Sequence, residues 1–211
     1  MKTFKEHINE SKATDIIHVF DLDDSLVFTD SKIYYTEPEQ PQKTASTGEF
    51  AKIRSKLHKN TKYDWKDFHE TKNSYMGIVK GRPNIPVLRL LDKAIASGSK
   101  IGILTARGNQ SSVLAAVKDW LLYKNSEGDL KKMPREIFKK KYCFAVGDLK
   151  TMKALGHMGG SLNPQDLKAY VLREIFGNKY GFKRIVFIDD DELTINTVDN
   201  LNDSRITTIK V

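Results

Sequence analysis

Carboxylate and hydroxyl side chains follow four short apolar runs of this chain, each time within a few residues of the end of the run. The four groups are Asp21-Leu22-Asp23-Asp24-Ser25, Thr105-Ala106-Arg107, Gly147-Asp148 and Asp189-Asp190-Asp191-Glu192. If the runs are parallel strands, their carboxyl ends meet at one edge of a sheet, and these groups converge there. Two carboxylates about 4 Å apart repel by about 4 kcal/mol at an effective dielectric constant of about 20, so the cluster needs a cation. Oxygen ligands without cysteine favour a hard divalent ion, and we expect Mg²⁺.

The apolar runs have the length and composition of buried parallel strands, and amphipathic segments lie between them. Strands are expected over residues 16–20, 101–104, 143–146, 185–188 and 206–209, and helices over residues 86–97, 111–122 and 163–177. Gly98 ends the first helical pattern and Asn163-Pro164 begins the third. This alternation predicts an α/β fold, a Rossmann-like doubly wound parallel sheet with right-handed crossovers.

Residues 31–80 interrupt the alternation of strands and helices. The stretch opens with Pro38 and Pro41 in a loop-like region and then becomes basic and aromatic. We interpret it as a small cap-like insertion after the first strand. The core domain would then comprise residues 15–30 and 81–211, and residues 1–14 would form an N-terminal extension.

Four motifs in this order resemble those of the haloacid dehalogenase-like phosphohydrolases. The first is Asp21-Leu22-Asp23 with a small hydroxyl residue close behind, and the second is a strand that ends in Thr105. The third is Lys168, on the helix that begins at Asn163-Pro164, and the fourth is the acidic pair Asp189-Asp190. The resemblance extends over about residues 15 to 200. It implies a parallel-sheet core with a cap and a Mg²⁺-dependent phosphatase activity.

Carried over by position, the resemblance implies a catalytic role for each motif residue. Asp21 would be the nucleophile that accepts the phosphoryl group as an aspartyl-phosphate. Asp23 would protonate the leaving oxygen and then activate the water that hydrolyses the intermediate. Thr105 and Lys168 would hold the phosphoryl oxygens.

The resemblance also implies a Mg²⁺ site and further contacts with the substrate. Ser25 and Arg107 would bind the substrate. The implied metal ligands are Asp21, Asp23 through its backbone carbonyl, Asp190 and Asp189, the last either as a ligand or as a partner of one.

Three positions depart from the family pattern. Asp24 stands where the family usually has Gly, and Ser25 stands where it usually has Thr. Thr194 stands where the fourth motif usually has a further Asp or Asn, and Asn196 or Glu192 is a candidate to replace that group. Asp24 adds charge beside the nucleophile, so we expect either slow turnover or an altered loop.

Other residues imitate parts of the pattern. Gly147-Asp148 looks like a fourth motif, but a lysine-bearing helix should precede that motif, and Lys168 precedes only Asp189-Asp190. Lys150 and Lys153 are alternatives for the lysine role.

Composition limits the class of protein. The chain has 211 residues with 35 basic and 27 acidic side chains, a formal charge of +8. Its one cysteine, Cys143, excludes an intramolecular disulfide and a cysteine-cluster zinc site. No apolar run approaches the length of a membrane span, so we expect no membrane partner and a cytoplasmic protein.

The positive charge predicts an anionic partner. Basic residues gather with aromatic ones around residues 52–68 and again over residues 131–141. The expected substrate is a phosphorylated small molecule, a nucleotide or a nucleic-acid end, as for a polynucleotide 3′-phosphatase. The alternative is a catalytically inactive protein of the same fold that binds nucleic acid or is packaged in a virion.

The first ten residues resemble the head-targeting segments of some internal proteins of tailed bacteriophages. Ile8-Asn9-Glu10 has the spacing at which a prohead protease cuts such segments. This resemblance implies a phage protein that works in the host cytoplasm or the virion interior.

Overall fold

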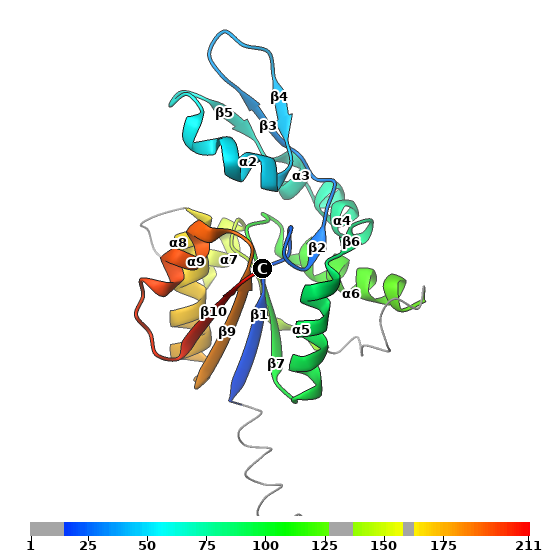
Figure 1. Cartoon of the computed structure of the whole chain (residues 1–211), viewed down its shortest axis with the longest axis vertical. Helices are drawn as coiled ribbons and strands as arrows, with labels where there is room; N and C mark the ends of the chain where they lie inside the picture. The colour runs from blue at the N-terminus through cyan, green and yellow to red at the C-terminus, as the bar shows by residue number, and fades with distance from the viewer. Residues whose placement is uncertain (1–14, 127–136, 158–162) are drawn as a thin grey trace, which may run out of the picture.

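A five-stranded parallel sheet with helices on both faces forms the larger part of this α/β protein (Figure 1). The computed structural model describes residues 15–126, 137–157 and 163–211. The expected N-terminal extension, residues 1–14, and most of the basic segment 131–141 lie outside these residues. The predicted α/β, Rossmann-like parallel sheet is confirmed.

The sheet places the first strand of the chain at its centre. Its strand order is β10-β9-β1-β7-β8, and all of its strand pairs are parallel. Each strand lies where an apolar run predicted it, although β8 begins five residues earlier than expected. The strands are β1 (Ile16–Phe20), β7 (Lys100–Thr105), β8 (Phe138–Ala145), β9 (Arg184–Asp189) and β10 (Ile206–Lys210).

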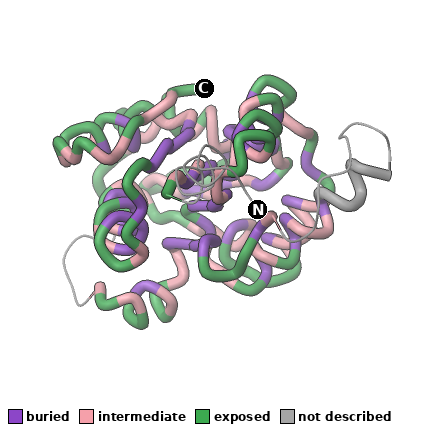
Figure 2. Tube along the Cα trace, turned by 90° about the horizontal axis from the view of Figure 1, so that it is seen from below, coloured by how far each residue is buried: buried purple, intermediate pink, exposed green. Residues whose placement is uncertain are grey.

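The helices divide into two layers that bury the two faces of the sheet. One face packs against α5 (Ile85–Ala96) and α6 (Gln110–Ser126). The other packs against α7 (Leu149–Ala154), α8 (Pro164–Tyr170), η3 (Val171–Lys179) and α9 (Glu192–Asp199). Figure 2 shows the buried residues along the inner sides of these helices and the exposed residues on their outer sides.

The chain reverses its direction across the sheet at β1. It moves from β1 to β7 and β8 on one side of the sheet and then returns to β9 and β10 on the other. A doubly wound sheet binds its ligands at such a switch point, beyond the carboxyl ends of the strands. The expected site residues therefore follow β1, β7 and β9, the central strands.

Residues 31–80 contain a small antiparallel sheet of their own, above the carboxyl edge of the large sheet (Figure 1). Two paired strands, β2 (Val27–Phe28) and β6 (Arg82–Pro83), connect this region to the core. Its elements are β3 (Ile33–Thr36), β4 (Lys43–Ala45), α2 (Thr47–Ile53), η1 (Arg54–Lys56), β5 (Lys62–Asp64), α3 (Lys66–His69) and α4 (Thr71–Val79).

Helix α4 packs with the core although it belongs to the expected insertion. Ile78 joins the apolar cluster that includes α5 and α6, and the Tyr75 hydroxyl donates a hydrogen bond to Asp119 of α6 at 2.7 Å. Residues 31–69, in contrast, contribute no side chain to the two apolar clusters of the core. We call this part the insertion below.

Two further expectations concern single features of the chain. None of the helices in the described residues is both long and apolar enough to cross a membrane. Cys143 is buried in β8, and burial raises the pKa of its thiol to about 12, so it is not a nucleophile.

The two tryptophans allow a test of how the core fixes Gly81, where the chain re-enters the core after α4. Trp120 is fully buried, and its indole N–H donates to the Gly81 carbonyl at 3.0 Å. Trp120→Phe should lower the free energy of unfolding by about 2 kcal/mol or more, because it leaves a buried carbonyl unpaired and opens a void. Urea denaturation measures this change. The matched variant Trp65→Phe, at a half-buried position of the insertion, should cost less than half as much; equal losses would contradict this account.

Candidate active site

Three of the expected site residues lie at the carboxyl ends of adjacent strands. Phe20 of β1 pairs with Ile188 of β9, so Asp21 and Asp189 come next on neighbouring strands. The backbone N–H of Asp21 donates to the Ile188 carbonyl at 2.8 Å and continues the ladder past the end of β1. Thr105 is the last residue of β7, on the other side of β1.

Lys168 joins these strand ends through two buried ion pairs. Its Nζ lies 2.7 Å from Asp21 Oδ1 and 2.7 Å from Asp189 Oδ2, and all three side chains are buried. Burial alone would lower the pKa of Lys168, but the carboxylates of Asp189 and Asp21 raise it well above its ordinary value. Lys168 is therefore a permanent ammonium, whereas Lys150 and Lys153, the alternatives for its role, are exposed on α7.

Asp190 adds a third carboxylate, and two hydrogen bonds with Ser25 fix its position. The Ser25 hydroxyl donates to Asp190 Oδ1 at 2.8 Å and accepts from the Asp190 backbone N–H at 2.9 Å. Burial, with the neighbouring Asp189, raises the pKa of Asp190 to about 6. Ser25 is fully buried. Its observed contact positions Asp190, which differs from the expected contact with substrate.

The three carboxylates have the composition and spacing of a site for a hard divalent cation. One oxygen atom from each of Asp21, Asp189 and Asp190 lies within 4.8 Å of the others. Ions with bonds of about 2.1 Å join ligand atoms up to about 4.2 Å apart, so a small adjustment would suffice. When all three are ionised, they leave an excess of two negative charges over the ammonium, which Mg²⁺ would balance. Burial raises the pKa of Asp21, as it does that of Asp190, so without a cation the cluster favours proton uptake. Both oxygens of Asp189 already accept hydrogen bonds, from Lys168 and from the Asp191 N–H, so its arrangement suits a partner of a ligand.

Asp23 is held by a buried arginine. Arg107 donates from Nε to Asp23 Oδ2 at 2.9 Å and from Nη2 to Asp23 Oδ1 at 2.6 Å. Thr29 donates its hydroxyl to Asp23 Oδ1 at 3.0 Å. This two-pronged contact fixes the plane of the carboxylate.

Arg107 is completely enclosed, so it does not face a ligand as expected from the sequence. Its Nη1 donates to the carbonyls of Asp67 and Ser74, and its Nη2 also donates to Ser31. The guanidinium lies 4.9 Å from the centre of the Phe68 ring. In this structure Arg107 positions Asp23 and joins the core to the insertion and α4, because all of its donor groups are engaged.

Thr105 is also buried at this edge of the sheet. Its hydroxyl oxygen accepts the backbone N–H of Arg107 at 3.3 Å. The structure thus brings Asp21, Lys168, Asp189 and Asp190 into direct contact or close proximity, and places Thr105 on the strand next to Asp21.

Asp24, which replaces the usual glycine, adopts a glycine-like backbone. Its φ is 61°, in the left-handed region, which Asp tolerates better than most residues. Its carboxylate accepts the Thr47 hydroxyl and the Gly48 N–H at the start of α2. The carboxylate of Asp24, close in the chain to the expected nucleophile Asp21, thus serves as a contact between core and insertion.

The residues around α9 also differ from the family pattern. Thr194 is buried, and its hydroxyl donates to Asp191 Oδ2 at 2.8 Å. Neither proposed replacement reaches the carboxylates, because Glu192 pairs with Lys210 and Asn196 is exposed. Asp148 caps the start of α7 and so lies outside the cluster, as expected.

Sequence reasoning missed a second contact of the insertion with the site. Arg54, at the end of α2, lies 2.9 Å from Asp191, the residue after Asp189-Asp190. Both side chains are half-buried. No spacing rule links positions 54 and 191, so no signal in the sequence could have revealed this pair. Asp24 and Arg54 are two charged contacts that hold the insertion above the carboxylates.

The crowding of the carboxylates should appear in the pH dependence of stability without metal. The folded-state pKa of Asp190, about 6, exceeds its unfolded value, so the folded state binds more protons between these values. The resulting stabilisation is complete below about pH 4 and is lost as the pH rises through 6. In EDTA, Asp190→Asn should therefore raise Tm above wild type at pH 7 but not at pH 4. Exposed Asp92→Asn is the control; parallel Tm curves for all three proteins would refute the crowding.

The two arginine–aspartate pairs should differ in their contribution to stability. Arg107→Met leaves Asp23 and several buried acceptors without a partner, and should cost about 3–5 kcal/mol of unfolding free energy. Arg54→Met removes a half-buried pair and should cost about 1 kcal/mol or less. Chemical denaturation of both variants measures the difference. Similar costs would show that Arg107 is not the buried tie described here.

Comparisons with known proteins do not assign this site. No family model, curated protein or solved structure matches the chain. The function is therefore argued from the geometry of the carboxylates, the lysine and the arginine.

Proposed function

We propose that this protein is a Mg²⁺-dependent phosphomonoester hydrolase of the haloacid dehalogenase-like type, acting through an aspartyl-phosphate. The observation that supports it best is the Asp21 carboxylate, fixed by Lys168 at the end of the central strand with Asp190 beside it. Asp23 follows two residues later and is fixed independently by Arg107. A nucleophile and a separately oriented proton carrier are what a two-step phosphoryl transfer needs.

In the proposed mechanism, residues of this chain carry out both the formation and the hydrolysis of the aspartyl-phosphate. Asp21 Oδ1 is bonded to Lys168, which leaves Oδ2 as the oxygen that attacks phosphorus. As the new O–P bond forms, the ester O–P bond breaks. To give the leaving oxygen a proton, Asp23 would first have to take one up on an oxygen released from Arg107, since both of its oxygens accept from that guanidinium in this structure. Asp23 then takes a proton from the water that attacks the aspartyl-phosphate, which releases phosphate and restores Asp21.

The charges of the site support a role for a divalent cation. Bound Mg²⁺ would screen the phosphate from the carboxylates and polarise its oxygens. Asp21 and Asp190 would hold it, together with the backbone carbonyl of Asp23. Lys168 would stabilise the negative charge of the transferring group.

The position of the insertion supports a cap that limits which substrates enter. Asp24 and Arg54 tie it to the core on either side of α2, above the carboxyl edge of the sheet. Residues 31–80 contain ten Lys or Arg residues and six Asp or Glu residues. We therefore propose a nucleotide or a nucleic-acid end as the substrate, because these present a phosphomonoester with further negative charge.

Replacement of the nucleophile tests the proposal directly. Wild type should release phosphate from p-nitrophenyl phosphate with Mg²⁺ and not in EDTA. Asp21→Asn should reduce the rate by about 10³-fold or more, because the amide cannot form the acyl phosphate.

The control for this experiment is Asp92→Asn, on the exposed side of α5, which should retain the wild-type rate. Equal rates in wild type and Asp21→Asn would refute the nucleophile. Absence of any Mg²⁺-dependent release from wild type, across nucleotides and end-phosphorylated oligonucleotides, would favour the inactive binding protein instead.

A further inference from the structure

The insertion presents several lysines that form no close ion pair, although Lys52 lies near enough to Glu49 to help lower the pKa of that carboxyl. Lys52, Lys56, Lys59 and Lys62 are exposed, and none of them pairs with an acidic side chain in the part of the chain that the structure describes. Their neighbours Arg54 and Lys66 do have partners, Asp191 and Asp64. A surface with unpaired cations attracts a polyanion more strongly than one with paired cations.

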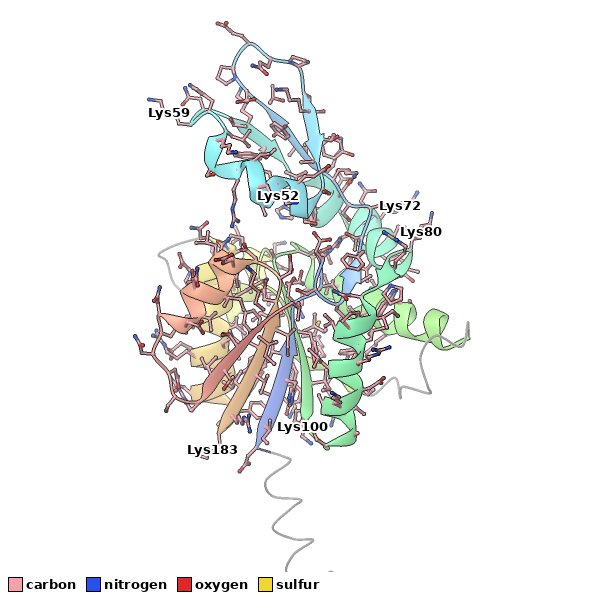
Figure 3. The ribbon with its side chains drawn as sticks, viewed as in Figure 1. Lys52, Lys59, Lys72, Lys80, Lys100 and Lys183 are labelled. Atoms are coloured by element: carbon pink, nitrogen blue, oxygen red, sulfur yellow. The ribbon has the colours of Figure 1, made fainter. Side chains whose placement is uncertain are left out.

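These lysines lie along a path that begins at the candidate active site. Arg54 is its inner end, because it contacts Asp191 next to Asp189-Asp190. From η1 the chain runs through Lys56 and Lys59 to β5, which begins at Lys62. Figure 3 places Lys52 on the core side of the insertion and Lys59 farther from the core, at the side of the insertion below the tip of the β3–β4 hairpin. The cations thus lead outward from the site, which suits a chain of phosphates better than one phosphate.

An aromatic side chain is exposed on the same stretch. Tyr63 is 41% exposed, and its ring packs against Phe50 at 5.6 Å and Trp65 at 6.1 Å between centres. Trp65 in turn packs against Phe68, which lies under Arg107. Tyr63 is therefore a supported ring with a free portion, the feature on which an unpaired base stacks.

We propose that the edge of the insertion that carries Lys52, Lys56, Lys59, Lys62 and Tyr63 binds single-stranded nucleic acid and leads its phosphorylated end to Asp21. Lys62 and Tyr63 point to opposite faces of β5, but β5 is an edge strand of the small sheet, so a ligand that runs along this edge can contact both. This inference rests on the proposed function and narrows its substrate from nucleotides to strand ends. Lysines would contact the phosphates, and Tyr63 would stack on a base. A membrane fits less well, because Tyr63 is the only large apolar side chain exposed on the described part of the insertion.

Binding is measured with the Asp21→Asn variant, which should not hydrolyse the phosphate of the bound strand. Asp21→Asn is titrated with a fluorescein-labelled 12-nucleotide DNA strand with a 3′-phosphate, and in parallel with an RNA strand of the same sequence, at several salt concentrations. Adding Lys56→Gln, Lys59→Gln and Lys62→Gln should weaken binding at least tenfold. The slope of log K against log salt should fall by about 2, since each lost phosphate contact removes about 0.7.

The matched control changes the same charge elsewhere. Lys93, Lys179 and Lys183 are exposed on the core, and Figure 3 shows Lys183 at the opposite end of the sheet from the insertion. Their triple change to Gln should leave affinity and slope as they are. Equal losses in both triple variants, or equal binding of phosphatidylserine vesicles and strand, would overturn the inference.

A second measurement separates this inference from the proposed function. In proteins with Asp21 intact, kcat/KM is compared for the 3′-phosphorylated strand and p-nitrophenyl phosphate. The insertion triple variant should lower the ratio of the two at least tenfold, and the core triple variant should not. If wild type hydrolyses neither substrate, the proposed function fails while the binding result stands. If both are hydrolysed and the ratio is unchanged in the insertion variant, the inference fails and the function stands.

Discussion

The buried contact of Lys168 with Asp21 and Asp189 is the interaction on which the rest of the site depends. It joins a helix of one layer to the ends of two central strands, with both distances at 2.7 Å. Two buried carboxylates on adjacent strands would repel each other strongly without this ammonium between them. With Asp190 included, one charge is still too few, and the excess of two negative charges remains for a divalent ion to balance. Burial raises the pKa of Asp21 and of Asp190, so this excess would be relieved either by protons or, as proposed, by a divalent ion.

The second constraint is that the core alone does not complete the site. Asp23 belongs to the loop after β1, but Arg107, which orients it, is enclosed by groups from α3, α4 and the segment before β3. The insertion must therefore fold for Asp23 to be held. Asp24 and Arg54 extend the same coupling to α2. The insertion, our proposed cap, thus also positions Asp23, the proposed proton carrier.

The sequence predicted what depends on local pattern and chain order. Continuous apolar runs predicted the five strands of the large parallel sheet. Because the carboxyl ends of parallel strands lie at one edge, they also predicted that Asp21, Thr105 and Asp189 come together there. It did not predict what depends on side-chain direction across the fold. Arg107, for example, was expected to face a ligand. It is enclosed instead, because α4 packs on α6 as part of the core. The contacts of Asp24 with Thr47 and of Arg54 with Asp191 join residues far apart in the sequence. The periodicity of apolar residues does not predict such contacts.

The contrast between the negative carboxylate cluster and the basic insertion would have a consequence for how a phosphate enters under the proposed function. Lys168 and Arg107 are fully engaged with carboxylates, so neither is free to attract a phosphate from a distance. The carboxylates themselves repel it until a metal ion is bound. Under the proposed function, attraction would come from cations outside the site, such as those of the insertion, whose Arg54 contacts Asp191. In the proposed function, the residues that attract the substrate would lie in the insertion and the residue that reacts with it would be Asp21. This arrangement would favour substrates with several charges, since only these can contact the insertion and Asp21 at the same time.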